Sequence, residues 1–128
     1  MGEGRFGGAT SRSGTPQFAA PEQLLGERVD QRADLYSLGA VAYFALLGRP
    51  PFAGSTPEQI LARQTTNDVP PLASQRKDVS RELEDVLRHA VRSEPGQRFS
   101  SAAAFREGLE GALGGFLRRL WTLLRPEG

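Results

Sequence analysis

The chain contains no cysteine and only one histidine, His89, and these absences exclude several kinds of site. Without cysteine there is no disulfide and no thiolate metal ligand, and a single histidine cannot form a histidine cluster for zinc. No stretch approaches the roughly 20 apolar residues that cross a bilayer. The N-terminus, MGEGRFGGATSRSG, has no apolar run of the secretory kind. The sequence therefore indicates a protein compatible with a reducing cytoplasm and predicts no metal site.

A charge excess of either sign is also lacking, since sixteen Lys plus Arg face fifteen Asp plus Glu. Bulk charge thus gives no reason to expect a nucleic-acid partner. The 38% of apolar residues is typical of globular proteins, and 128 residues allow one modest core. No segment shows the alternation of a strand, so the chain is predicted to be all-α.

Five helices are predicted from apolar spacing and capping residues. They cover residues 21–25, 33–47, 57–65, 81–92 and 102–113, with Thr56, Ser80 and either Ser100 or Ser101 as N-caps. The helix over 33–47 ends at Gly48 and is apolar on nearly every side. It is therefore expected to be buried on most sides, with Val41 and Ala45 in the core.

The pattern divides the chain into three parts. Residues 1–13 are rich in Gly, Ser and Thr and are predicted to be mobile, or to be a remnant of a longer loop. Residues 14–113 form the helical body. Gly114 and Gly115 are expected to break the last helix, so that 114–128 becomes a linker followed by a short basic amphipathic tail.

Three motifs follow one another in the body: GTPQFAAPEQ over residues 14–23, DQRADLYSLG with LGRPPF over 30–39 and 47–52, and PGQRFS over 95–100. In this order they resemble the large lobe of protein kinases, in particular of bacterial-type serine/threonine kinases. Ala20-Pro21-Glu22 matches the A-P-E signature that ends the activation segment. The resemblance implies a partial kinase C-lobe: the end of the activation segment plus about five helices.

The resemblance assigns a structural ion pair to Glu22 and Arg98, which would hold the activation segment on the lobe. A buried carboxylate needs such a partner, and arginine offers a planar two-pronged donor. It also implies that Asp34 anchors the catalytic loop by accepting backbone N–H bonds. Because Asp34 lies in the most apolar helix, it needs hydrogen-bond donors if it is buried. The alternative role for Asp34 is that of an Asp in the first turn of a helix, stabilised by the helix dipole. The two roles are compatible, because Asp34 lies near the N-terminus of its helix.

The segment before the A-P-E signature would face the substrate. By resemblance Thr15 would contact the catalytic residues, and Pro16, Gln17, Phe18 and Ala19 would line the groove for the residues beside the phosphoacceptor. Thr10, Ser11 and Ser13 precede it, where activation loops of the family are phosphorylated. Plain turn and capping roles remain the alternative for these hydroxyl residues.

Several parts that phosphoryl transfer needs are missing from the sequence. It has no Gly-rich loop after a strand, no H-R-D and no D-F-G, and its one lysine, Lys77, lies in a loop flanked by prolines. Arg5-Phe6-Gly7 comes nearest to D-F-G but has Arg where a Mg²⁺ ligand belongs. Complete members of the family use ATP and Mg²⁺, whereas this chain is expected to bind neither and to have no catalytic residue of its own.

Three functions are therefore open. The chain is a C-lobe fragment of a kinase that is inactive alone, a stand-alone non-catalytic module that binds a protein substrate or a partner kinase lobe, or an enzyme with residual activity. The tail over 116–125 adds a separate question. It combines six apolar residues with Arg118, Arg119 and Arg125, and is expected to cover the body, bind a partner, or lie on an anionic membrane.

Overall fold

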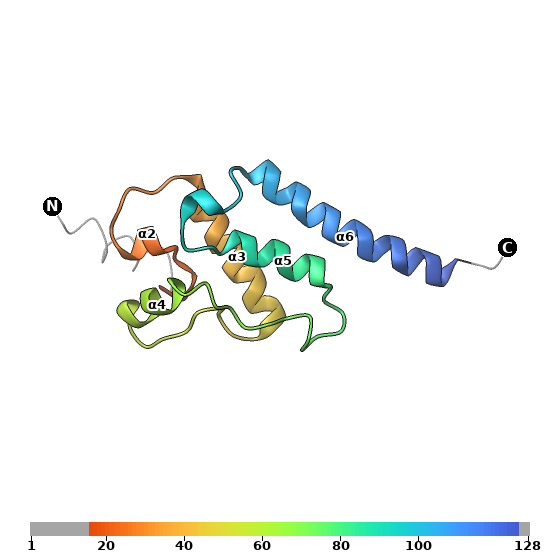
Figure 1. The fold of residues 1–128 in the computed structure, drawn as a ribbon, viewed down its shortest axis with the longest axis horizontal. Coiled ribbons are helices and arrows are strands. Elements are labelled where there is room, and N and C mark those ends of the chain that lie inside the picture. Colours follow the sequence, from red (N-terminus) through yellow and green to blue (C-terminus); the bar gives the residue numbers. More distant parts are fainter. Residues whose placement is uncertain (1–15, 126–128) are drawn as a thin grey trace.

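The computed structural model describes residues 16–125, and for residues 115–120 it describes the backbone alone. Within this range the elements are η2 (Pro16–Phe18), α2 (Pro21–Leu24), α3 (Gln31–Leu47), α4 (Pro57–Gln64), α5 (Arg81–Ala90), η3 (Pro95–Gln97) and α6 (Ala102–Leu124) (Figure 1). No strand occurs among the described residues. The predicted all-α fold is confirmed, and the order of its helices agrees with the pattern of the sequence.

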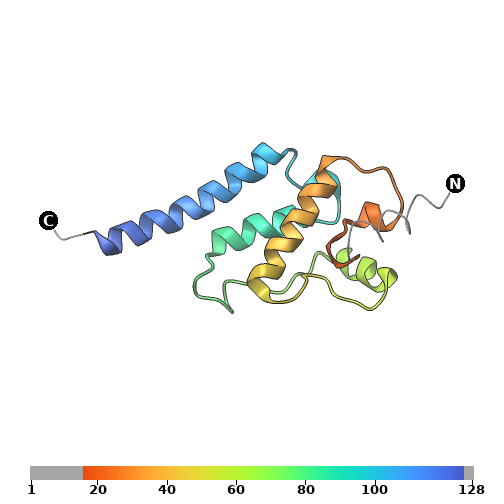
Figure 2. The ribbon, with the colours of Figure 1, turned by 180° about the vertical axis from the view of Figure 1, so that it is seen from behind.

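The centre of the fold is the crossing of α3 and α5, which both views of the ribbon show (Figures 1 and 2). Gly39 makes this crossing close, because a Cβ at that position would lie 2.7 Å from the Cβ of Ala90. Tyr36, Tyr43 and Leu87 are fully buried around it. The core therefore lies between these two helices, and α2, α4 and α6 pack around it.

Local capping explains most helix starts. The side chains of Thr56, Ser80 and Ser101 accept the backbone N–H groups of Gln59, Leu83 and Ala104, respectively. The first two caps were predicted, and the structure selects Ser101 over Ser100 for the third. Helix α3 begins two residues earlier than expected, since Asp30 accepts the N–H of Arg32. It ends where expected, at Gly48, whose φ of 90° suits glycine.

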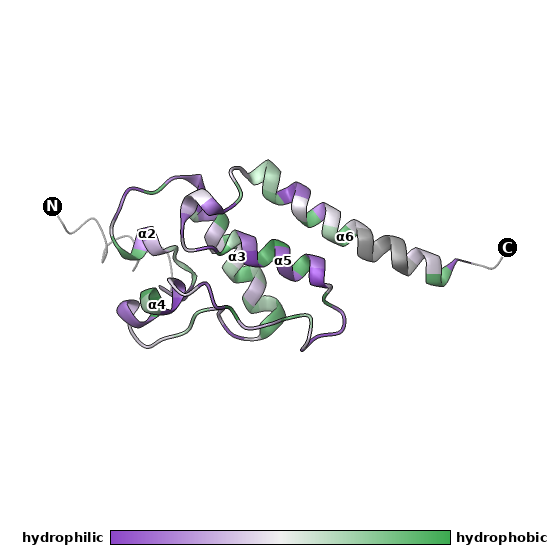
Figure 3. Ribbon diagram, in the orientation of Figure 1, coloured by the Kyte–Doolittle hydropathy of each residue, from purple (hydrophilic) through white to green (hydrophobic). Residues whose placement is uncertain are grey.

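One face of α3 is exposed, while its other sides are buried or half-buried, in agreement with the expectation of burial on most sides. Leu38, Val41 and Phe44 are 57%, 47% and 41% exposed, and Ala45 is exposed as well. Val41 and Ala45 are therefore not core residues here. Among the described residues Phe18 contacts Phe44 at the edge of this face, while Leu38 and Val41 stay uncovered. The helix is strongly hydrophobic toward its C-terminal end (Figure 3). An apolar sequence predicts that a helix can be buried. Whether a given face is buried depends on a neighbouring segment that packs against it.

Helix α6 continues through Gly114 and Gly115 to Leu124, so the predicted helix break is wrong. A glycine inside a helix costs only about 0.5–1 kcal/mol relative to alanine, and good helix formers stand on both sides. Phe105 and Ala112 attach the first half of α6 to the body. Ala102, at the start of the helix, is exposed. The second half leads away from the body (Figure 1).

Candidate functional site: the anchor of the segment before helix α3

Glu22 and Arg98 meet in a buried two-pronged ion pair, although 76 positions separate them in the sequence. The two terminal nitrogens of Arg98 each donate to one oxygen of Glu22, both at 2.8 Å. The side chains are 0% and 7% exposed for Arg98 and Glu22. Pro21 starts helix α2 and so sets the direction of Glu22. The predicted pair is confirmed as a contact.

Three backbone carbonyls complete the surroundings of Arg98. Its Nε donates to the carbonyl of Arg92 at 2.7 Å, and its terminal nitrogens donate to those of Ser93 at 3.0 Å and Arg32 at 3.1 Å. A guanidinium has five N–H groups, and all five therefore have an acceptor. The ring of Tyr36 lies under the same group, 4.9 Å from Cζ. Arg98 thus joins α2 to the start of α3 and to the end of α5.

Gln64 is a second anchor, which sequence reasoning missed. It ends α4, is 1% exposed, and its Nε2 donates to the carbonyl of Ala19 at 2.8 Å and to the hydroxyl oxygen of Tyr36 at 3.0 Å. Burial raises the pKa of Tyr36 well above its usual range, so the phenol stays neutral. The one available signal was the spacing of four residues from Ile60, which places Gln64 on the buried face of α4.

The residues predicted to line the substrate groove lie directly beside these anchors. Pro16, Gln17 and Phe18 form the turn η2, whose side chains are half-buried, and Ala19 follows with its N–H bonded to the carbonyl of Pro16. The Phe18 ring meets the Phe44 ring of α3 edge to face, with centroids 5.6 Å apart. Phe44 of α3 therefore packs against the turn, and Gln64 of α4 binds the Ala19 carbonyl that follows it.

Four of the predicted site residues lie outside the described range. These are Thr15 and the predicted phosphorylation sites Thr10, Ser11 and Ser13. Their roles stay predictions.

Asp34 lies in the first turn of α3 and is exposed, not enclosed by apolar side chains. It needs no protein donor there because water can solvate its carboxylate. By helical spacing it shares a face with Leu38, Val41 and Ala45, the same face that the described residues leave uncovered. The structure does not bring Asp34 to Glu22 and Arg98. Its role as an anchor of a catalytic loop stays a prediction.

That this chain binds neither ATP nor Mg²⁺ stays a prediction. No group of three or more His, Cys, Asp or Glu in residues 16–125 is arranged to hold a metal ion. Lys77, the one lysine of the chain, is exposed in the loop before α5, far along the chain from the anchored turn. His89 is exposed on α5 and stacks on Phe99, with centroids 4.1 Å apart.

Comparisons with known proteins agree with this architecture. The family model of the protein kinase domain matches residues 2–108. The serine/threonine-protein kinase Pkn1 of Myxococcus xanthus is 43% identical over 115 residues, which are 90% of this chain and 17% of that protein. The serine/threonine-protein kinase PknB of Mycolicibacterium smegmatis is 41% identical over 96 residues, 75% of this chain and 15% of that protein.

A solved structure gives the same result at the level of the fold. The twitchin kinase region from C. elegans superposes with a TM-score of 0.60 at 27% identity, covering 79% of this chain and 17% of that one. The chain therefore belongs to the protein kinase domain family, as the resemblance implied. It spans about a sixth of the length of the curated relatives it matches.

Proposed function

We propose that this chain is the substrate-side helical part of a bacterial-type protein serine/threonine kinase and that the 128 residues alone do not transfer phosphate. The observation that carries the proposal is the Glu22–Arg98 pair, which ties helix α2, directly after the turn over residues 16–19, to the helical body. In a complete enzyme this turn would contact the residues of a protein substrate beside the phosphoacceptor.

Two further features support this role. The exposed face of α3 carries Leu38, Val41 and Phe44, and Asp34 begins the same face. In a complete kinase the catalytic loop and a neighbouring helix would cover it, with Asp34 accepting backbone N–H groups of that loop. ATP and Mg²⁺ would be held by that remaining part of the enzyme, because this sequence has no H-R-D and no D-F-G motif.

A chimera tests the proposal. Residues 14–128 are joined to Pkn1 of Myxococcus xanthus, replacing everything that follows its D-F-G loop, and phosphate transfer from labelled ATP to a basic protein substrate is measured. We expect the chimera to be active and the 128-residue chain alone to give no signal above a blank. Arg98→Ala in the chimera should lower activity at least about tenfold, since it leaves Glu22 buried and unpaired.

Arg106→Ala is the matched control, because Arg106 is 68% exposed and reaches Glu110 only at 4.0 Å. It should leave the activity of the chimera unchanged. An inactive chimera that is folded by circular dichroism would contradict the assignment of a substrate-side lobe. Phosphate transfer by the isolated chain would contradict the second half of the proposal.

A stand-alone binding module is the second candidate, and the exposed apolar face of α3 is the observation that favours it. In that case the chain would bind a separate kinase domain through Leu38 and Val41. Calorimetry with the purified kinase domain of Pkn1 would detect this, and Val41→Glu should abolish the heat signal. An active chimera together with no binding in calorimetry would support the role as a kinase fragment and contradict the role as a stand-alone binding module.

A further inference from the structure

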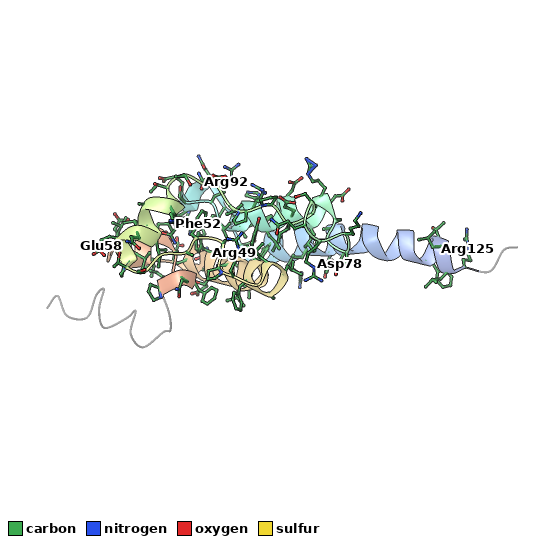
Figure 4. All side chains as sticks on the ribbon, turned by 90° about the horizontal axis from the view of Figure 1, so that it is seen from below. Arg49, Phe52, Glu58, Asp78, Arg92 and Arg125 are labelled. Carbon is green, nitrogen blue, oxygen red and sulfur yellow. The ribbon has the colours of Figure 1, made fainter. Side chains whose placement is uncertain are left out.

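The end of α6 carries the most exposed of the large hydrophobic side chains in the described part of the chain. Beyond Ala112 the helix runs away from the body, and its last labelled residue, Arg125, stands apart from all the other labelled side chains (Figure 4). Trp121, Leu123 and Leu124 are 61%, 81% and 69% exposed. Three large apolar side chains at the end of a protruding helix call for a partner.

The exposed residues are arranged as on an amphipathic helix. With 3.6 residues per turn, Leu113 and Leu124 are three turns apart and share one side, and Trp121 lies one turn before Leu124 on the same side. Arg125 follows Leu124 by about 100° around the axis and so lies beside this apolar side. The end of the helix therefore has an apolar side with the basic side chain of Arg125 next to it.

The charge of this segment selects the partner. Residues 111–126 contain three arginines and no Asp or Glu. A second copy of the same segment would bring arginine to arginine, which opposes pairing. A surface with negative charge attracts each basic residue near it by about 1 kcal/mol. Tryptophan also favours the boundary between water and hydrocarbon, since its ring is apolar and its N–H needs a polar partner.

We propose that the end of α6 lies on an anionic membrane surface, with Trp121 and Leu124 entering the boundary between headgroups and acyl chains. Arg125 would then face the lipid phosphates. Among the described residues no helix is long and apolar enough to pass through a bilayer, so the contact is one of lying on the surface. A single short helix of this kind gives weak and reversible attachment. The proposal stands independently of the catalytic role of the chain.

The sequence supplies a probe for this contact, because Trp121 is its only tryptophan. The 128-residue chain is titrated with vesicles of equal parts phosphatidylglycerol and phosphatidylcholine while tryptophan emission and co-sedimentation are recorded. With these anionic vesicles we expect a blue shift of the tryptophan emission. Binding to vesicles of pure phosphatidylcholine should be at least about tenfold weaker. Salt at about 0.5 M should release the protein, since it screens the arginines.

Leu124→Glu should weaken binding at least about tenfold, because it places a carboxylate on the inserting side. Leu38→Glu is the matched control: Leu38 is a 57% exposed leucine on α3 and its change adds the same charge elsewhere. It should bind vesicles like the unchanged protein. Circular dichroism checks that both variants keep their helices.

Three outcomes would overturn the proposal. The first is equal binding to neutral and anionic vesicles, and the second is equal loss of binding in Leu38→Glu and Leu124→Glu. The third is a blue shift that grows with protein concentration in the absence of lipid. That result would show that Trp121 is covered by a second copy of the chain.

Discussion

Arg98 shows how much a single residue can hold in this fold. All five of its N–H groups have acceptors, and these acceptors belong to four different residues of the body. Arg98→Ala should lower the free energy of unfolding by about 3–5 kcal/mol, because it leaves the Glu22 carboxylate buried without its partner. Urea unfolding followed by circular dichroism measures this.

Glu22→Gln tests the same pair from the other side and should also destabilise. Arg106→Ala should leave the urea midpoint unchanged, since both partners of the Arg106–Glu110 pair are about 70% exposed. If Arg98→Ala shifted the midpoint no more than Arg106→Ala does, the buried pair would not be an anchor.

Glu84 gives the fold a dependence on pH. Burial raises the pKa of its carboxyl, but bonds from the Ala73 N–H and from Arg88 outweigh this and hold the pKa below its usual value. A lowered folded-state pKa adds stability above the unfolded value of about 4.5, and this stability is lost as the pH falls through the folded pKa. Glu84→Gln should therefore make Tm decrease less steeply as the pH is lowered into the acid range.

Melting curves of the unchanged protein and of Glu84→Gln between about pH 3 and 7 would show this difference. Glu82→Gln is the control, since Glu82 is an exposed neighbour in the same helical turn. Parallel curves for the unchanged protein and Glu84→Gln would contradict the role of Glu84.

At the scale of the elements, two glycines inside helices have opposite roles. A Cβ at Gly39 would lie 2.7 Å from the Cβ of Ala90, whereas a Cβ at Gly114 would meet nothing within 4 Å. Gly39→Ala should destabilise by about 1–3 kcal/mol through overpacking of the α3–α5 crossing. Gly114→Ala should stabilise α6 by about 0.5–1 kcal/mol, since alanine favours the helix.

The helical signal and the unfolding midpoint of both variants test this difference in sign. Since each change adds one methyl group inside a helix, each serves as the control for the other. Destabilisation by Gly114→Ala would mean that α6 is not continuous at this position, as the sequence alone had suggested.

At the scale of the whole molecule, the exposed face of α3 decides how the chain behaves alone. Leu38→Gln with Val41→Gln should reduce the binding of a hydrophobic dye and the tendency to self-associate, because it removes the centre of an apolar patch. Stability should change by no more than about 0.5 kcal/mol, as both side chains are already in water.

The matched control replaces Leu25 and Val29, which are 52% and 47% exposed in the connection before α3. Leu25→Gln with Val29→Gln should have the smaller effect on dye binding, because these residues do not lie on the α3 face. Equal effects of the two double variants, measured by dye fluorescence and light scattering, would show that this face has no special part in association.

The sequence by itself determined the features that depend on neighbours along the chain. Thr56 and Ser80 as caps, Gly48 as the end of α3 and the order of the helices all follow from bonds and spacings within a few residues. The Glu22–Arg98 contact was reached differently, from a resemblance to a family, because nothing local connects two residues 76 positions apart.

Only the tertiary structure decided which surfaces are covered. Gln64 is polar yet fully buried, because the Ala19 carbonyl and the Tyr36 hydroxyl require a partner between α3 and α4. Val41 is apolar yet exposed, because no described segment packs on its side of α3. The chemistry of a side chain sets the free energy that its burial would cost or contribute. Burial itself requires a second surface that packs against the side chain, and that surface comes from elsewhere in the fold.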